Sequence, residues 1–218
     1  MKFAAVIFDL DGTIIKSEDV WGKAYLSVFK KLGGKIDKGF VHTPGVSVRS
    51  NWKQILVKYS LRTHKTPEEL ETLTYIEYGK LIPEVKLNDG IVEFVDSLQE
   101  NGTSLALATS TNWETTSKVL EHFGLTNCFE NITTGEEVEN PKPAPDIFLL
   151  ASEKLGVDPV DCLVIEDSMS GVTAAHEAEM KVIAVSNGED TKSLDGADLI
   201  VEGFPEITLK AIDAIDSD

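Results

Sequence analysis

The sequence predicts an α/β fold, in which a mainly parallel sheet is flanked by helices and a helical segment is inserted after the first strand. Short apolar runs recur that are typical of strands buried on both faces. Amphipathic segments separate the later runs, with apolar residues three and four positions apart. One long interval has helical patterns and no buried-strand run. Strands that alternate with helices of this length form right-handed βαβ units, and 218 residues are enough to bury such a core.

The first apolar run covers residues 3–8 and ends directly before Asp9. The later runs and the amphipathic segments between them predict a Rossmann-like parallel sheet. We expect strands at 104–108, 131–133, 162–165, 182–185 and 198–201, and helices at 90–101, 115–123, 146–155 and 170–180. The acidic segment Asp213–Asp218 is expected to be a frayed tail.

The interval between the first strand and residue 86 breaks this alternation. It shows helical patterns at 20–32, 50–59 and 67–81. Residues 16–86 carry 13 Lys+Arg and 8 Asp+Glu, a net charge of +5, whereas the rest of the chain has 7 and 29, a net charge of −22. Most of these lysines have the simpler interpretation of solvated helix faces. We predict a core domain of residues 1–14 and 86–218 and a helical cap domain of residues 15–85.

The composition argues against several partners. The net charge of −17 gives an acidic surface that repels phosphate backbones, so no nucleic-acid partner is expected. No apolar run approaches the roughly 20 residues of a membrane helix, and the first run is too short for a secretory signal, so no membrane partner is expected. Cys128 and Cys162 match no metal or redox spacing, which favours a reduced, cytoplasmic location. We also expect a monomer.

Asp9 and Asp11 close the first predicted strand. The period of two along a strand places both side chains on one side, where two carboxylates repel each other and require a cation or a shared proton. Mg²⁺ prefers such oxygen ligands, so one acid could be a metal-bound nucleophile while the other moves protons. Acids that cap a turn are the plain alternative. A calcium loop is disfavoured because its twelfth position is Val20 and not glutamate.

Three further polar segments follow predicted strands. Thr109–Asn112 offers hydroxyl and N–H groups to an anion at a helix start, or simply an N-cap. Lys142 lies between prolines, as a point charge for phosphate or as an ordinary surface lysine. Glu166 and Asp167 are either solvated or help to hold a cation. The carboxyl ends of parallel strands meet at one edge, so all four segments are expected to share one space.

In this order, and each at a strand end, the four segments resemble the haloacid dehalogenase-like hydrolase superfamily, in the branch that contains β-phosphoglucomutase and small-metabolite phosphatases. The resemblance covers essentially the whole chain. It implies a phosphatase with Mg²⁺ as cofactor that acts on a small phosphorylated metabolite, a sugar or polyol phosphate, through an aspartyl-phosphate. The alternative is a phosphomutase of the β-phosphoglucomutase type. Thr13 is commoner in the phosphatases, which favours hydrolysis. A non-catalytic binding protein is disfavoured because the site residues are intact.

The resemblance also implies residue roles. Asp9 would be the nucleophile and Asp11 the general acid/base, with its backbone carbonyl on the metal. The phosphoryl group is expected at Thr109, Ser110 and Lys142, and the metal at Asp9, Asp11, Asp167 and Glu166, the last directly or through water. One departure is that Asn140 and Pro141 precede the lysine, where family members usually carry Gly or Ser.

Residues 39–49 resemble the specificity segment of the cap in this branch. Arg49, one of only two arginines, is expected to bind a second anionic group of the substrate. His42 is expected to hydrogen-bond a sugar hydroxyl or shuttle a proton, with a solvated loop histidine as the equal alternative. Asn112 is a further substrate-binding candidate. Weaker candidates for the pocket wall are Trp21, Lys23 and Trp113.

Overall fold

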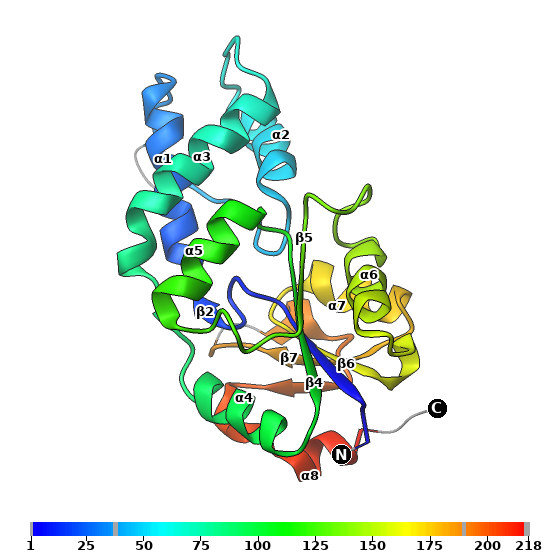
Figure 1. Cartoon of the computed structure of the whole chain (residues 1–218). Coiled ribbons are helices and arrows are strands. Elements are labelled where there is room, and N and C mark those ends of the chain that lie inside the picture. The colour runs from blue at the N-terminus through cyan, green and yellow to red at the C-terminus, as the bar shows by residue number, and fades with distance from the viewer. Residues whose placement is uncertain (1, 37–38, 189–190, 216–218) are drawn as a thin grey trace.

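The computed structural model describes residues 2–36, 39–188 and 191–215. Its centre is a six-stranded sheet with all neighbouring strands parallel, which confirms the predicted fold class (Figure 1). The strand order is β5-β4-β1-β6-β7-β8. The strands are β1 (Ala5–Phe8), β4 (Ser104–Thr109), β5 (Asn131–Thr134), β6 (Cys162–Glu166), β7 (Lys181–Val185) and β8 (Leu199–Val201), each at a predicted apolar run.

The strand order reverses direction at β1. From β1 the chain builds β4 and β5 on one side, and then β6, β7 and β8 on the other. The connection after β1 leads to β4 on one side, and the connection after β6 leads to β7 on the other. The two connections leave in opposite directions and open a crevice at the carboxyl ends of β1 and β6, where ligands bind in open α/β sheets. The ends of β1, β4 and β6 are therefore the place at which a site is expected.

Helices cover both faces of the sheet. Val6 and Phe8 of β1 pack into one buried cluster, while Ala5 and Ile7 pack into another, as the alternation of side chains along a strand requires. The first cluster is covered by α4 (Ile91–Glu100), α5 (Trp113–Phe123) and α8 (Leu209–Asp213), and the second by α6 (Asp146–Leu155) and α7 (Met169–Glu177). The predicted helices of the sheet domain are thereby confirmed.

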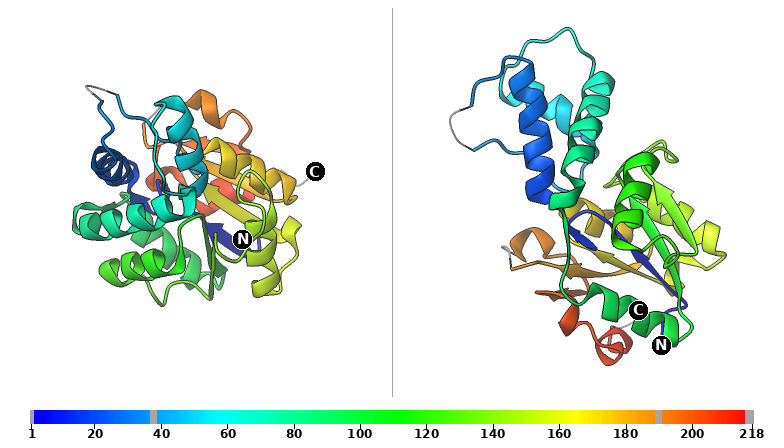
Figure 2. Two further views of the ribbon diagram at one scale, coloured as in Figure 1. Left: turned by 90° about the horizontal axis from the view of Figure 1, so that it is seen from above. Right: turned by 60° about the vertical axis from the view of Figure 1, so that its left-hand side comes forward.

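Three helices stand together beyond the carboxyl edge of the sheet (Figure 2). They are α1 (Glu18–Lys31), α2 (Val48–Lys58) and α3 (Pro67–Leu81). Aromatic side chains join them: the rings of Trp21 and Tyr78 stack with centroids 3.8 Å apart, and the buried Trp52 donates its indole N–H to Thr74 Oγ1 at 2.7 Å. These contacts pack α1 and α2 against α3.

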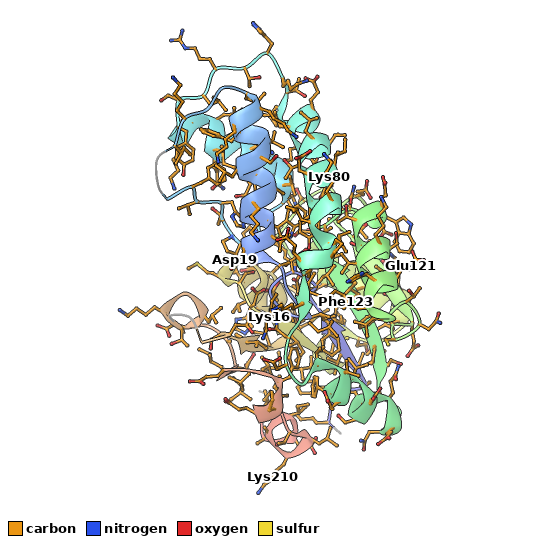
Figure 3. All side chains as sticks on the ribbon, turned by 90° about the vertical axis from the view of Figure 1, so that its left-hand side faces the viewer. Lys16, Asp19, Lys80, Glu121, Phe123 and Lys210 are labelled. Atoms are coloured by element: carbon orange, nitrogen blue, oxygen red, sulfur yellow. The ribbon has the colours of Figure 1, made fainter. Side chains whose placement is uncertain are left out.

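A short antiparallel pair of strands, β2 (Ile15–Lys16) and β3 (Lys86–Leu87), connects the three helices to the sheet. Figure 3 faces this side of the molecule, with Lys16 near the junction and Lys80 higher on α3. Sequence reasoning missed both strands because two residues are too few to show a period. Asn88 follows β3, and its buried amide donates to the carbonyl oxygens of Gly12 and Thr13 at 2.8 and 2.6 Å. This ties the junction to the loop after β1.

The expectation of a frayed tail from Asp213 is wrong for its first residues. Asp213 ends α8 and accepts a hydrogen bond from the backbone N–H of Lys2 at 2.8 Å, and Ile215 is buried. Residues 216–218 lie outside the described part. No helix within the described residues is long and apolar enough to cross a membrane.

Glu77 of α3 binds α1 and gives a stability prediction. Its carboxylate accepts from Ser27 Oγ at 2.6 Å and pairs with Lys31 at 2.7 Å and with Lys80, and these contacts lower its pKa to about 2. A depressed carboxyl pKa stabilises the fold above the ordinary value of 4.5, and this gain is lost as the pH falls toward 2. Because both lysines are exposed, we expect Glu77→Gln to cost about 1 kcal/mol of unfolding free energy at pH 7. Urea unfolding at pH 7 and pH 2 checks this, and an equal difference at both pH values would contradict it.

Candidate active site

The end of β1 and the ends of its two neighbours bring the predicted polar segments together. Asp9 follows β1, Ser110 follows β4, and Asp167 follows β6, so that all three lie at the carboxyl edge. Gly135, after β5, packs against the carbonyl of Ser110 so closely that an added Cβ would lie 2.6 Å from the oxygen. A side chain at this position would push the Ser110 loop out of place.

Lys142 joins this edge from the loop before α6. Its side chain is 1% exposed, and its ammonium group lies 2.6 Å from Asp9 Oδ1 and 2.7 Å from Glu166 Oε1. A lysine in a proline-rich turn is usually solvated, so the burial favours the predicted functional role over the surface alternative. Burial raises the pKa of Asp9 to about 8, although Lys142 beside it favours the carboxylate form. A single cation therefore does not compensate for the desolvation of the site.

Glu166 holds the lysine in place. Its second oxygen accepts hydrogen bonds from the backbone N–H groups of Asp167 and Ser168, both at 2.8 Å, and from Ser168 Oγ at 2.9 Å. An added Cβ on Gly171 would lie 1.7 Å from Glu166 Oε1, so glycine is required for the carboxylate to fit. The expectation that Glu166 ligates a metal directly is not supported, because both oxygens are occupied by protein donors. Glu166 is a positioning residue for Lys142.

The carboxylate of Asp11 joins the sheet domain to the inserted helical segment. Its Oδ1 accepts from Ser17 Oγ and from the indole N–H of Trp21, both at 2.7 Å, and its Oδ2 accepts from Thr111 Oγ1 at 2.7 Å. These three hydrogen bonds fix the direction of the carboxylate. Asp11 lines the same cleft as Asp9, and a carboxyl group in such a place can transfer a proton.

Asp167 lies against the loop after β1. Gly12 has a φ of +80°, and an added Cβ there would lie 1.8 Å from Asp167 Oδ2. Glycine is therefore needed both for the left-handed backbone and for the close approach of the carboxylate. Desolvation raises the pKa of Asp167 well above its ordinary value, and the neighbouring carboxyl groups of Glu166 and Asp9 raise it further.

The carboxylates at the sheet edge are the candidate ligands for Mg²⁺. Within the described residues, no three His, Cys, Asp or Glu side chains converge as a complete ligand set. Asp11 faces Trp21 and Glu166 faces Lys142, which leaves the carboxylates of Asp9 and Asp167. Mg²⁺ typically binds one or two carboxylates together with waters and substrate phosphate oxygens, so these two acids suit it.

A cleft of about 410 Å³, measured to its open mouth, lies between the sheet edge and the three helices. Its floor contains both aspartates after β1 and the segment after β4. Its opposite wall comes from α1, the loop before α2 and the start of α2. The lining residues are Asp9, Asp11, Thr109, Ser110 and Thr111 below, and Glu18, Trp21, Tyr25, His42, Thr43, Pro44, Gly45, Val46, Ser47, Val48 and Asn51 above.

The structure corrects the placement of two predicted substrate contacts. Arg49 is half-exposed and donates to Glu71 Oε2 from Nε and Nη2 at 3.0 and 2.8 Å, away from the cleft. Asn112 is the N-cap of α5, where its Oδ1 accepts the backbone N–H of Thr115 at 3.1 Å. Two weaker candidates for the pocket wall do not line the cleft either: Lys23 pairs with Glu84, and Trp113 is 54% exposed. Trp21 and His42 do line the cleft.

Sequence reasoning missed three side chains of the cleft. Thr111, which binds Asp11, lies in a segment that the sequence singled out, but its neighbours offered equally good hydroxyl groups. Glu18 and Tyr25 lie on α1, where an acidic first turn and an aromatic core residue are ordinary helix features. Their place in the cleft depends on how α1 packs over the sheet edge, which no local pattern reports.

The chain is similar in sequence to known proteins over most of its length. Residues 6–185 match the family model described as haloacid dehalogenase-like hydrolase. The chain is 29% identical over 214 residues to hexitol phosphatase B of Escherichia coli (strain K12), with 96% of each chain covered. It is 29% identical over 215 residues to β-phosphoglucomutase of Bacillus subtilis (strain 168), with 95% of this chain and 93% of the relative covered.

Solved structures give the same result. The crystal structure of β-phosphoglucomutase from Clostridium difficile superposes with a TM-score of 0.84 at 25% identity, covering 97% of this chain and 96% of that one. The matched family region runs from the first strand of the sheet to β7, and it includes every predicted site residue. The chain belongs to the haloacid dehalogenase-like hydrolase family.

Proposed function

We propose that this phosphoric monoester hydrolase is a Mg²⁺-dependent phosphatase that hydrolyses a sugar or polyol phosphate through an aspartyl-phosphate on Asp9. Residues 15–85 would form the cap domain over the site. The observation that carries the proposal is the buried Asp9 carboxylate, held 2.6 Å from the ammonium of Lys142 at the switch point of the sheet. Sequence similarity to hexitol phosphatase B of Escherichia coli supports a phosphorylated carbohydrate as the substrate.

In the first step, Asp9 attacks phosphorus with a carboxylate oxygen. A bond forms between Asp9 and phosphorus while the bond from phosphorus to the ester oxygen breaks. Asp11 gives a proton to the departing alcohol, for which its position on the same side of the strand end suits it. Lys142 and the hydroxyl and N–H groups of Thr109 and Ser110 stabilise the negative charge on the phosphoryl oxygens.

In the second step, water hydrolyses the aspartyl-phosphate. Asp11, now a carboxylate, accepts a proton from the attacking water, whose oxygen bonds to phosphorus as the bond to Asp9 breaks. Inorganic phosphate leaves and Asp9 is regenerated. Each residue thus returns to its starting protonation state, with one water consumed for each ester cleaved.

Asp9, Asp167 and the backbone carbonyl of Asp11 would hold the Mg²⁺ ion. When bound, the ion supplies positive charge to the carboxylates and to the phosphoryl oxygens. Asp167 is positioned for this by the close approach of Gly12 and by Thr13 Oγ1, which lies 3.2 Å from Asp167 Oδ1. Glu166 acts indirectly, by holding Lys142 in place.

The second candidate is a phosphomutase, in which the aspartyl-phosphate is transferred back to a reoriented sugar. The similarity in sequence and structure to β-phosphoglucomutases of Bacillus subtilis and Clostridium difficile favours it. Both reactions use the same first step, so the residues around Asp9 do not distinguish them. The difference lies in whether water or a second sugar hydroxyl reaches the phosphorus.

Phosphate release from a panel of sugar and polyol monophosphates tests the proposal, with conversion of glucose 1-phosphate to glucose 6-phosphate followed in parallel. We expect phosphate release with Mg²⁺ and no accumulation of glucose 6-phosphate. Removal of divalent ions with EDTA should lower the rate by about 100-fold or more, and added Mg²⁺ should restore it. Clean interconversion without phosphate release would identify a mutase, and full activity in EDTA would contradict the role of the metal.

A further inference from the structure

Glu18 is the acidic residue that α1 contributes to the wall of the cleft. It lies in the first turn of the helix, and its side chain is 30% exposed. It lines both the cleft above Asp9 and a larger open cavity beside it, which includes Asp167. A substrate whose phosphate lies at Asp9 and whose remainder extends toward the cap therefore passes Glu18.

His42 fixes the direction of this carboxylate. Its Nε2 lies 2.8 Å from Glu18 Oε2, and only 14% of the histidine side chain is exposed. The imidazole packs against Tyr25, with ring centroids 5.1 Å apart. The ring also lies close to Gly22, where an added Cβ would be 3.9 Å from Nδ1. Because His42 occupies one oxygen of Glu18, the second oxygen is left for the cleft, where it can accept hydrogen bonds from hydroxyl groups.

Within the described residues, the same wall has no lysine or arginine side chain to bind an anionic group. Val48 is buried and lines the cleft at the start of α2, whereas Arg49 turns outward to Glu71 and Glu68. Among the described residues that line the cleft above Asp9, none is lysine or arginine. Lys16, in the larger cavity, pairs with Asp89 at the junction, 2.8 Å away.

We propose that Glu18, held by His42, selects substrates with an uncharged polyhydroxy tail and rejects those with a second phosphate or a carboxylate. This rests on the proposed function and specifies its substrate class. Hydroxyl groups donate to the free oxygen of Glu18, whereas a second anion would meet a fixed negative charge at short range, where like charges strongly oppose binding.

The selection also bears on the choice between hydrolysis and mutase chemistry. A mutase of this type transfers the phosphoryl group from Asp9 to a sugar that already carries a phosphate. That second phosphate must lie in the cap wall while the first is at the nucleophile. Because Glu18 lies in this wall and Arg49 does not, the wall opposes the bisphosphate that mutase chemistry requires. We therefore expect net hydrolysis.

A matched pair of substrates tests this inference. Glucitol 6-phosphate and 6-phosphogluconate have the same carbon chain and differ at the far end, which is a hydroxymethyl group in one and a carboxylate in the other. For the wild-type protein we expect kcat/KM to be about 100-fold higher for glucitol 6-phosphate, and Glu18→Gln should reduce this ratio to about tenfold or less. The glutamine keeps an acceptor oxygen and loses the charge.

Two variants control for general effects of charge and folding. Glu93→Gln removes a charge from the exposed first turn of α4, outside the cleft and the larger cavity, and Arg49→Gln changes the outward-facing arginine. Both should leave the wild-type ratio unchanged. A ratio that Glu18→Gln leaves within twofold of wild type, or a wild-type preference for 6-phosphogluconate, would overturn the inference while the phosphatase activity stands. Failure of the wild-type protein to hydrolyse even p-nitrophenyl phosphate would overturn the proposed function and this inference with it.

Discussion

Replacement of Asp9 by asparagine is expected to reduce hydrolysis of p-nitrophenyl phosphate by at least about 10⁴-fold with Mg²⁺ present. The side-chain amide of asparagine has the same shape as the carboxylate but cannot attack phosphorus to form the acyl phosphate, so the first step is lost. Aryl phosphates have a good leaving group and need little help from Asp11, which makes the assay sensitive to the nucleophile itself. The measurement is steady-state release of nitrophenolate.

The fold should survive this change. Burial disfavours the charged form of Asp9, so the loss of this charge removes a desolvation penalty. Lys142 stays paired with Glu166 at 2.7 Å, so no unpaired cation is left. Circular dichroism and urea unfolding should show a native protein. Glu77→Gln, which is far from the cleft in α3, serves as the activity control and should keep wild-type turnover. Asp9→Asn with more than a few per cent of wild-type turnover would mean that another group is the nucleophile.

Replacement of Lys142 by methionine is expected to affect both activity and stability. The ammonium group is 1% exposed and compensates two buried carboxylates, Asp9 and Glu166. Without it, these buried charges are left unpaired, and loss of one partner of a buried ion pair typically costs roughly 3–5 kcal/mol. Phosphate release should fall by about 10²–10³-fold, because a cation that faces the phosphoryl oxygens is lost. Urea unfolding and steady-state kinetics measure the two effects.

A double variant separates the pairing from other effects of the substitution. In Lys142→Met/Glu166→Gln, the amide oxygen still accepts from the backbone of Asp167 and Ser168, while the uncompensated charge of Glu166 is gone. We expect this protein to be more stable than Lys142→Met alone, although it remains nearly inactive. Destabilisation that simply adds the two single losses would show that Lys142 and Glu166 are not coupled.

The positions of the strands and of the main site residues could be predicted from the sequence because local patterns encode them. A strand buried on both faces must be apolar throughout, so six short runs identified the six strands of the sheet. Asp9 and Asp167 directly follow such runs, and parallel strands place their carboxyl ends at one edge. Lys142 was identified only together with the other segments, since a lysine between prolines is not specific by itself.

The direction of single side chains could not be predicted in the same way. Arg49 is one residue from Val48, and successive helical residues point about 100° apart. Val48, Trp52 and Ile55 form one buried stripe of α2, which fixes the rotation of the helix and directs Arg49 outward to Glu71. Which stripe of α2 is buried depends on its packing against α3, and the sequence of α2 alone does not report this.

Two features of this protein thus have different origins. The parallel sheet, the inserted helices and the acids at the strand ends can be predicted from local patterns, because backbone periodicity and burial act over a few residues. The contact between Glu166 and Lys142, and the place of Glu18 rather than Arg49 at the cleft, become visible only in the folded chain. The physical reason is that these contacts join residues that are distant in the chain, so helix rotation and the closeness of the backbones at Gly12 and Gly171 select them.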